Sequence, residues 1–496
     1  MRYCLRLFVG VLIFGCACTS RGSEAVLSPK VDPRVELLSV VFRLVGNPEY
    51  NMSPLKKYTA DIDAYFSPYK EHPAIVLARK LANERDIGFD AVMTLAVYLS
   101  PPPELKPLFD FRDDVPDARY GKGNAALLAM RLADFYRDTQ FEKFFAAHQA
   151  FYQLAEDRFR VALAGLDLNW YKSFYGNAQI GQYNLILGMN NGGGNYGPRL
   201  VWPDRHEEYY SIIGCWTQDD SGNPTYSTDY LPTIIHEFNH SFVNPAFAQH
   251  KNEFAFAQQV YVPVADKMKE QAYGNSDTMV IESLVRAAVI QYIKSRGHDS
   301  REGRNEIRGE QMSGFVWMDE LVDLLDQYNS QRSRYPTFES FMPVVVRYYR
   351  SLAPRITEVI ASFNQHCVHV TGMQPFPNHS TNAAPETKEL VITFDKPLDP
   401  QAGPRHHGYS ISAGSDDTEH YPISGTPEFL PGNRSIKLPV VLKPDLDYSF
   451  VLTPLAFASP DGYPLETYTI AFKTRRRPRS QGSWLLWIYG GPGLTI

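Results

Sequence analysis

The chain has 496 residues, of which 44% are hydrophobic and 21% are charged, an ordinary composition for a globular protein. Its formal net charge is -6, so it lacks the basic excess that is typical of nucleic-acid-binding proteins, and we expect no nucleic-acid partner. This length predicts two to three domains and allows a large hydrophobic core.

Residues 1–18 have the composition of an export signal. Two arginines precede an apolar stretch, Leu7 to Phe14, that is too short to span a bilayer. Cys16 and Cys18 each follow a small residue, as the lipidated cysteine of a bacterial lipoprotein signal does, and a plain secretory signal is the alternative. We therefore expect an exported protein, either a cell-envelope lipoprotein held to the membrane by its lipid, in the periplasm or at the cell surface, or a secreted protein.

Residues 19–45 are expected to form a tether, and residues 46–170 a helical subdomain. Four segments of this subdomain place apolar residues at helical spacing: Ala74–Glu84, Phe89–Leu99, Asn124–Phe135 and Glu142–Leu163.

Two short apolar segments, Tyr183–Met189 and Tyr209–Gly214, are typical of strands. The loop between them, Asn190 to Asn195, is rich in glycine but carries no phosphate-binding fingerprint. We expect the first strand to lie at a sheet edge, where it could align an extended substrate by strand addition. Ordinary sheet strands are the alternative.

The segment that follows contains the pattern H-E-x-x-H at His236, Glu237 and His240. On a helix, side chains four residues apart lie one above the other, so both imidazoles can reach the same point. Neutral imidazoles at this spacing suit zinc. Glu237 lies beside them, where a carboxylate can take a proton from a water that the metal activates. The alternative is a pair of exposed histidines on a solvated helix face.

The sequence around this pattern predicts an amphipathic helix. Asp229 or Ser227 can cap its N-terminus, Pro232 falls in its first turn, and Asn244-Pro245 is expected to end it. One face is apolar and lies nearly opposite the histidines, with the residues Leu231, Ile235, Phe238 and Phe242.

Glu282 is the candidate for a third ligand. The helix expected at Thr278–Ser295, capped by Ser276 or Asp277, is apolar almost all round. A buried carboxylate in such a helix needs a partner, which Arg286 four residues on, a metal ion, or both can supply. Because zinc needs a third protein ligand, we predict that Glu282 is a ligand, with Glu253 in a polar stretch as its rival.

The rest of the chain divides into helices and then strands. Gly314–Tyr328 and Thr337–Leu352 are amphipathic and are expected to complete a catalytic domain over 46–368, with the sheet and metal helices in 171–368. Residues 372–475 are expected to form a β-sandwich, followed by a tail at 476–496. Its predicted strands are Leu390–Phe394, Tyr409–Ser412, Ser435–Leu438, Tyr448–Leu452 and Tyr468–Thr474.

Residues His236–Pro245 together with Glu282–Ala287 resemble the gluzincin branch of zinc metallopeptidases. More narrowly, residues 45–365 resemble an uncharacterised bacterial domain-of-unknown-function family in that clan. The resemblance implies that His236, His240 and Glu282 bind zinc and that Glu237 is the general base. Gluzincins also use a tyrosine or histidine to stabilise the tetrahedral oxyanion, and Tyr273 is the candidate here, with Arg286 as a second residue that could contact the substrate or transition state.

The segments F-D-K-P-L-D-P at 394–400 and Y-T-I-A-F-K-T at 468–474 are similar to those of bacterial Ig-like domains, which usually act as spacers or binding modules. The only cysteines beyond the export signal, Cys215 and Cys367, could pair in an oxidising compartment.

We therefore expect an α+β protein, with a mostly helical zincin-like metallopeptidase domain that contains a small mixed sheet, followed by an all-β Ig-like sandwich. The expected function is that of an exported zinc-dependent peptidase acting on a peptide or protein. The alternative is a non-catalytic cell-surface binding protein that uses the metallopeptidase fold as a scaffold.

Overall fold

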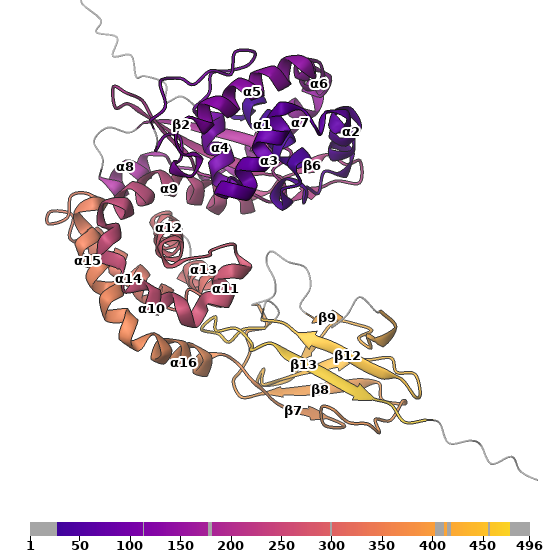
Figure 1. The fold of residues 1–496 in the computed structure, drawn as a ribbon. Helices are drawn as coiled ribbons and strands as arrows, with labels where there is room; N and C mark the ends of the chain where they lie inside the picture. The colour runs from indigo at the N-terminus through magenta and orange to yellow at the C-terminus, as the bar shows by residue number, and fades with distance from the viewer. Residues whose placement is uncertain are drawn as a thin grey trace, which may run out of the picture. The chain divides into compact units, whose positions relative to one another are not determined.

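The computed structural model describes residues 27–112, 114–176, 181–297, 300–401, 411–413, 418–454 and 457–476. The fold is α+β and divides into two compact units (Figure 1). The first unit contains the chain up to Val161, Gln182–Tyr196 and Leu200–Thr225, and the second contains Ala162–Gly181, Gly197–Arg199 and the chain from Tyr226 on. The expected export signal, with Cys16 and Cys18, and the expected tail from 477 on lie outside the described residues.

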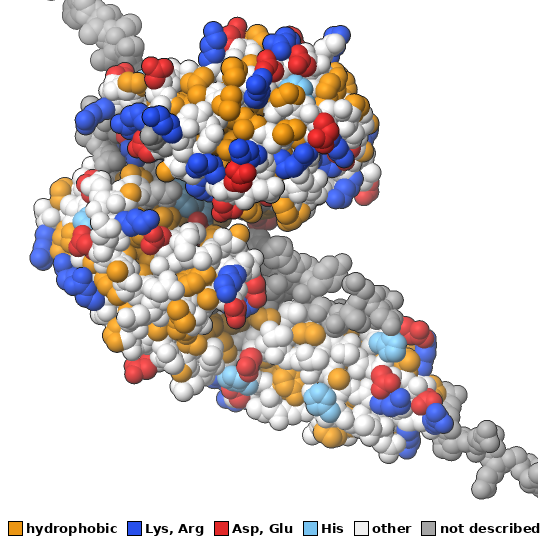
Figure 2. Space-filling model, in the orientation of Figure 1, with side chains coloured by type: hydrophobic (Ala, Val, Ile, Leu, Met, Phe, Trp, Pro, Cys, Tyr) orange, Lys and Arg blue, Asp and Glu red, His pale blue; other side chains and the backbone are white. Residues whose placement is uncertain are grey.

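The first unit is built from helices that surround short strands. Its helices are Pro33–Val45 (α1), Lys56–Phe66 (α2), Pro73–Arg85 (α3), Phe89–Val97 (α4), Asn124–Asp138 (α5), Phe141–Ala147 (α6) and Gln149–Phe159 (α7), with short 3-10 helices at Pro48–Tyr50, Ser67–Tyr69, Ala118–Tyr120 and Arg160–Leu163. A small hairpin joins Thr217–Gln218 (β5) to Pro224–Thr225 (β6). The first three helical segments predicted between 74 and 135 are therefore confirmed, whereas the segment predicted at Glu142–Leu163 is divided into α6, α7 and a 3-10 helix. On the face drawn in Figure 2, basic and acidic side chains are interspersed over this unit.

A sheet has the strand order β1-β2-β4-β3, with Pro29–Val31 (β1), Gln182–Gly188 (β2), Glu207–Gly214 (β4) and Arg199–Val201 (β3). The two predicted strands are confirmed as β2 and β4. However, β2 is not an edge strand, because it pairs in parallel with β1 on one side and with β4 on the other. Its backbone groups are already paired, so strand addition to β2 is ruled out.

Helix α1 lies where the sequence predicted a tether, and this prediction is wrong for residues 29–45. Asp32 caps the helix by accepting a hydrogen bond from the backbone N–H of Arg34, and Gly46 ends it in a left-handed conformation with φ of 102°. Val35, Leu38 and their neighbours are buried. This agrees with the apolar composition of the segment, which is typical of a helix that is covered on all sides.

Glu36 in α1 is a fully buried carboxylate that holds the glycine-rich loop after β2. Its Oε1 accepts the backbone N–H of Met189 at 2.7 Å, and its Oε2 accepts the Tyr58 hydroxyl at 2.6 Å. Burial raises the pKa of Glu36 to about 7, although the donors Tyr58, Met189 and Asn190 act in the opposite direction. The carboxyl therefore binds its proton more tightly in the folded chain than in the unfolded chain.

We predict that this group gives folding a pH dependence that the Glu36→Gln variant loses. With a folded pKa of about 7 and an ordinary value of 4.5, the folded state binds more protons than the unfolded state between these pH values. As pH rises through this window, the free energy of unfolding of the wild type should fall by about 3 kcal/mol relative to Glu36→Gln. Urea unfolding at pH 4.5 and pH 7.5 measures this, with exposed Glu71→Gln as the control, and equal pH dependence in all three proteins would contradict it.

The second unit contains two longer helices that pack against each other, Leu231–His250 (α9) and Ser276–Ser295 (α12). The other helices are Asn169–Tyr175 (α8), Ala257–Tyr261 (α10), Ala265–Glu270 (α11), Ser300–Met312 (α13), Met318–Ser330 (α14), Phe338–Leu352 (α15) and Ile356–His366 (α16), with 3-10 helices at Thr228–Tyr230, Lys251–Phe254, Val262–Val264 and Ala353–Arg355. Helix α12 also packs against α10, α13 and α14, which explains its apolar composition.

The ends of α9 and α12 differ from those predicted. Ser227 caps a 3-10 turn that leads into α9, and α9 continues through Pro245, because Ala246 and Phe247 are buried and anchor its last turns. The N-cap of α12 is Asn275, whose side chain accepts the N–H of Thr278 at 2.9 Å, and not Ser276 or Asp277.

The C-terminal part of this unit, residues 370–476, is called the β module here. One sheet has the order β10-β11-β8-β7, with Glu428–Phe429, Ser435–Pro439, Glu389–Phe394 and Val370–Gln374, and the other has the order β13-β12-β9, with Tyr468–Lys473, Asp447–Leu452 and Ile411–Ala413. The paired strands of both sheets are antiparallel. In β8 and β12, alternate residues are buried in one common core, as strands with one covered face require.

Cys367 is a buried free thiol, so the disulfide with Cys215 that the sequence left open does not form. Within the described part of the chain, no helix has the length and hydropathy needed to cross a membrane.

Candidate metal centre

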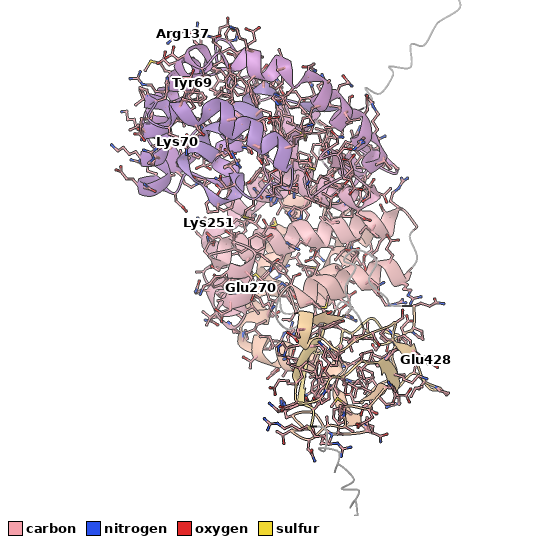
Figure 3. The ribbon with its side chains drawn as sticks, turned by 90° about the vertical axis from the view of Figure 1, so that its right-hand side faces the viewer. Tyr69, Lys70, Arg137, Lys251, Glu270 and Glu428 are labelled. Carbon is pink, nitrogen blue, oxygen red and sulfur yellow. The ribbon has the colours of Figure 1, made fainter. Side chains whose placement is uncertain are left out.

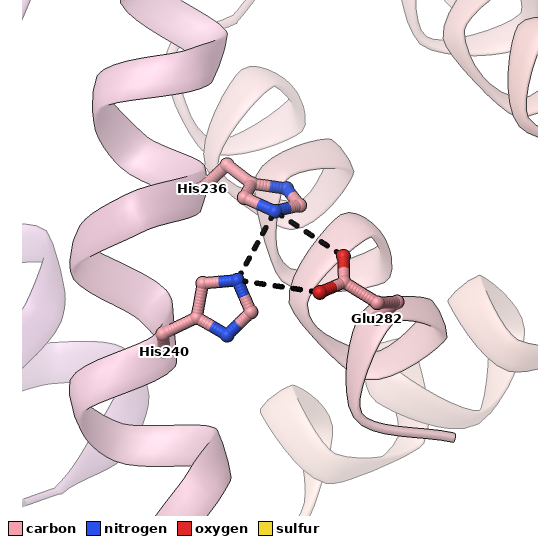
Figure 4. A group of neighbouring side chains, drawn as sticks. All are labelled: His236, His240 and Glu282. Carbon is pink, nitrogen blue, oxygen red and sulfur yellow. Dashed lines mark hydrogen bonds and ion pairs between the residues drawn. The ribbon is translucent and has the colours of Figure 1, made fainter. Parts of the chain in front are cut away.

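Two packed helices of the second unit bring the predicted ligands together. His236 and His240 lie one turn apart on the same face of α9, while Ile235 and Phe238 on another face are buried. Glu282 projects from α12, which packs against α9. Figure 4 shows the three side chains converging on one point. The three residues that the sequence predicted as metal ligands therefore lie together.

The distances between the ligand atoms suit a small metal ion. His236 Nε2 lies 3.2 Å from His240 Nε2 and 3.3 Å from Glu282 Oε2, and His240 Nε2 lies 3.6 Å from Glu282 Oε1. Ligands at zinc–nitrogen and zinc–oxygen distances of about 2.0–2.2 Å in a tetrahedron are about 3.3–3.6 Å apart. All three residues can therefore each offer one atom to the same ion.

The protonation states also favour a cation. Burial is the main cause that lowers the pKa of His236, to about 4, so its imidazole is neutral at physiological pH. Burial would raise the pKa of Glu282, but His240, His236 and Arg286 lower it to about 2. A neutral imidazole and an ionised carboxylate are the forms that bind metal. In addition, the buried Oε2 of Glu282 has no hydrogen-bond donor among the described residues, so a cation would satisfy it.

Glu237 is 5% exposed and follows His236 directly in α9. Burial, and then the charge of Glu282, raise the pKa of Glu237 well above its ordinary value, while Arg286 lowers it. The backbone at Gly197 packs directly against the backbone of Glu237. The approach is so close that a Cβ at residue 197 would lie 2.0 Å from the Glu237 carbonyl oxygen. Only glycine fits there, and no feature of the sequence marks this position.

Arg286 and Tyr273, the two predicted substrate or transition-state residues, contact each other. Arg286 Nη2 donates to the Tyr273 hydroxyl at 2.9 Å, and Arg286 Nη1 donates to Glu310 Oε2 at 2.6 Å. Arg286 Nε lies 3.9 Å from Glu282 Oε2. Burial would lower the pKa of Arg286, but Glu310, Tyr273 and Glu282 raise it, so the guanidinium stays charged. Burial raises the pKa of Tyr273, and its hydroxyl stays protonated.

Asn244 is a site residue that the sequence interpretation missed. His240 Nδ1 lies 3.1 Å from Asn244 Oδ1, an acceptor, so this contact places the ring proton on Nδ1 and leaves the lone pair on Nε2 facing Glu282. The signal was present in the sequence, because Asn244 follows His240 by four residues, but the expected end of the helix at Asn244-Pro245 hid it.

Glu253, the rival for the third ligand, lies elsewhere. It is in the 3-10 helix after α9, its carboxylate contacts His250 Nδ1 at 2.7 Å, and its side chain is 52% exposed. It is not among the three residues whose ligand atoms converge.

A family model described as "Domain of unknown function (DUF4932)" matches residues 27–348, which is more than half of the chain. The chain belongs to this family. The matched residues include α1, α9 and α12, and therefore all three predicted ligands, whereas the β module lies beyond them. No curated protein matches the chain.

Among solved structures, the chain is similar to the bacterial surface-layer protein SbsC. The structure of its domains 1-6 matches at 14% identity over 50% of this chain and 34% of that chain, with a TM-score of 0.18. Its N-terminal part matches at 15% identity over 52% of this chain and 60% of that chain, with a TM-score of 0.17. The matches span only part of the SbsC chains, and at these TM-scores they carry no argument about fold or function.

We predict that Asn244→Ala weakens zinc binding about 10-fold or more, because loss of a hydrogen-bond partner of a ligand typically costs 10–100-fold in affinity. Competition with a chromophoric chelator measures the affinity. Asn252→Ala, an exposed asparagine just after the same helix, is the control and should bind zinc as the wild type does. Equal affinity in Asn244→Ala and the wild type would show that Asn244 does not orient His240.

Proposed function

We propose that the protein is an exported zinc-dependent metallopeptidase of the gluzincin type. The observation that carries this proposal is the convergence of His236, His240 and Glu282 at mutual distances of 3.2–3.6 Å, with a second buried acid, Glu237, next to the first ligand. A site that only held a metal for stability would gain nothing from this second carboxylate, because its burial is unfavourable.

His236, His240 and Glu282 would hold the ion through their Nε2, Nε2 and carboxylate atoms. A bound zinc ion supplies a Lewis acid that polarises the scissile carbonyl and lowers the pKa of water to about 7. Three protein ligands would match the number that catalytic zinc sites use, in which a fourth position is kept for water or substrate.

Glu237 would act as the general base and then as the general acid. Its carboxylate takes a proton from the attacking water and delivers it to the leaving amine of the peptide. Burial raises the pKa of Glu237, which makes its carboxylate a stronger proton acceptor and suits this role.

Tyr273 is our candidate for stabilising the oxyanion. Its hydroxyl accepts from Arg286, and its raised pKa, caused first by burial and then by Glu282, keeps its own proton in place as a hydrogen-bond donor. We predict that Tyr273→Phe lowers kcat about 10-fold or more and leaves zinc affinity within about twofold of the wild type. Steady-state kinetics with a cleaved peptide, together with zinc titration, tests this, and an unchanged kcat would remove Tyr273 from the mechanism.

For the β module, we propose an Ig-like sandwich. Its two antiparallel sheets with a common core support this assignment. For localisation, we propose the cell envelope, with a lipid anchor at Cys16 or Cys18, on the basis of the N-terminal composition alone.

The Glu237→Gln variant tests the proposed function directly. It should keep one zinc ion per chain and lower turnover by about 10²–10⁴-fold, because it retains the shape of the side chain and removes its proton transfer. Glu253→Gln is the matched control, since Glu253 is an acid outside the site, and it should match the wild type in both measurements. Full activity of Glu237→Gln would exclude Glu237 as the base.

A peptide-library screen, with and without a chelator, identifies the cleaved sequence. Chelator-sensitive cleavage by the wild type supports the peptidase. Bound zinc without cleavage would favour the non-catalytic alternative, and clearly less than one zinc per chain would contradict both.

A further inference from the structure

We propose that the β module supports the metal centre and is not only a spacer. Its contacts help to hold α13 in position, and α13 in turn holds the Arg286 guanidinium in its position beside Glu282. This inference rests on the metal site proposed above and concerns how that site is held. Every residue it uses belongs to the second unit.

The turn before the last strand of the β module packs against α13. The guanidinium of Arg308 in α13 lies over the ring of Tyr463, with its carbon 3.9 Å from the ring centre. Gly462 has φ of 81° and approaches so closely that a Cβ there would be 3.3 Å from Arg308 Cγ. Tyr463 also stacks on His366 at the end of α16, with ring centres 5.0 Å apart. The turn therefore contacts both α13 and α16.

A second contact holds the first turn of α13. Arg301 forms an ion pair with Asp399 of the β module, and its Nη1 donates to Gln401 Oε1 at 3.2 Å. The two arginines lie about two turns apart, so the β module contacts α13 along most of its length.

The last turn of α13 carries Glu310, which fixes Arg286. Glu310 Oε2 accepts from Arg286 Nη1 at 2.6 Å, and both side chains are less than 20% exposed. The rest of the Arg286 guanidinium contacts the Tyr273 hydroxyl, Gln271 Oε1 at 3.4 Å and the ring of Phe315, whose centre is 5.0 Å away. Among these groups, Glu310 is the only one with a full negative charge, so it determines which way the guanidinium is drawn.

Helix α13 packs against α12 and α14 but contributes few buried side chains to that packing. Of residues 301–312, only Gly303 and Gln311 are buried. The helix contains two glycines, Gly303 and Gly309, which are among the poorest helix formers, and a polar helix of this length is marginal in isolation. Polar contacts therefore help determine where it lies: Arg308 forms an ion pair with Asp319 of α14, and Arg301 and Arg308 contact the β module.

The consequence for the metal centre has a definite direction. If α13 is released, Glu310 no longer draws the guanidinium away, and the nearest other carboxylate is Glu282, whose Oε2 is already 3.9 Å from Arg286 Nε. A closer Arg286–Glu282 pair than this one would compete with a cation for that carboxylate. Loss of the β-module contact should therefore weaken metal binding, although Tyr463 touches none of the three ligands.

The experiment measures zinc affinity of the full chain by chelator competition for Tyr463→Ala, Glu310→Gln and the double variant. Each single variant should lose about 10-fold or more, the range typical for residues that support metal ligands. Because both act through the same helix, the double variant should lose clearly less than the product of the two single losses. Tyr463→Phe keeps the ring under Arg308 and should restore affinity to within about twofold of the wild type.

Two controls separate this coupling from general damage. Arg304→Gln changes an exposed charge on α13, and Lys437→Gln breaks the pair with Glu428, which lies at the periphery of the β module in Figure 3. Both should bind zinc as the wild type does. Wild-type affinity in Tyr463→Ala, or fully multiplicative losses in the double variant, would overturn the proposal.

Hydrogen exchange keeps the inference testable independently of the proposed function. In the metal-free protein, Tyr463→Ala should speed amide exchange across residues 300–312, while Lys437→Gln should not. If the wild type bound no zinc, the proposed function would fail. Unchanged exchange in Tyr463→Ala would instead show that the β module does not hold α13.

Discussion

The second unit depends on compensating one buried charge, the carboxylate of Glu282. A carboxylate on an almost wholly apolar helix is strongly unfavourable unless cationic or metal partners surround it. Here two imidazoles of α9 approach from one direction and the Arg286 guanidinium from another. This requirement fixes the face that α9 turns toward α12, and it leaves Ile235 and Phe238 to pack into the core. The same pair of helices therefore serves both as the centre of the fold and as the site.

The residues that could be predicted from the sequence are those whose role follows from spacing or composition within one element. His236 and His240 are four residues apart on a helix, which by itself places them on one face. Glu282 stands out because it is an acid in an apolar helix, which must have a partner. Both inferences use only neighbours along the chain, and for that reason they agree with the structure.

The errors come from contacts between distant parts of the sequence. Strand β2 was expected at an edge because nothing in residues 183–189 reveals that Pro29–Val31 pairs with it. Pro245 was expected to end α9, but the burial of Phe247 outweighs the local preference. The roles of Gly197 and Glu310 could not be predicted for the same reason. Gly197 is required because the backbone of Glu237 lies close to it, and Glu310 belongs to a helix with too few apolar residues to be predicted from its spacing.

The state of Cys367 has a practical consequence. Beyond the N-terminal segment, the sequence has only one other cysteine, Cys215. Cys367 is a buried thiol, and burial raises its pKa to about 11, which suppresses the reactive thiolate. Among the described residues, no disulfide therefore distinguishes a reducing from an oxidising environment. Residues 27–476 can therefore be produced in a reducing cytosol with no oxidative refolding step.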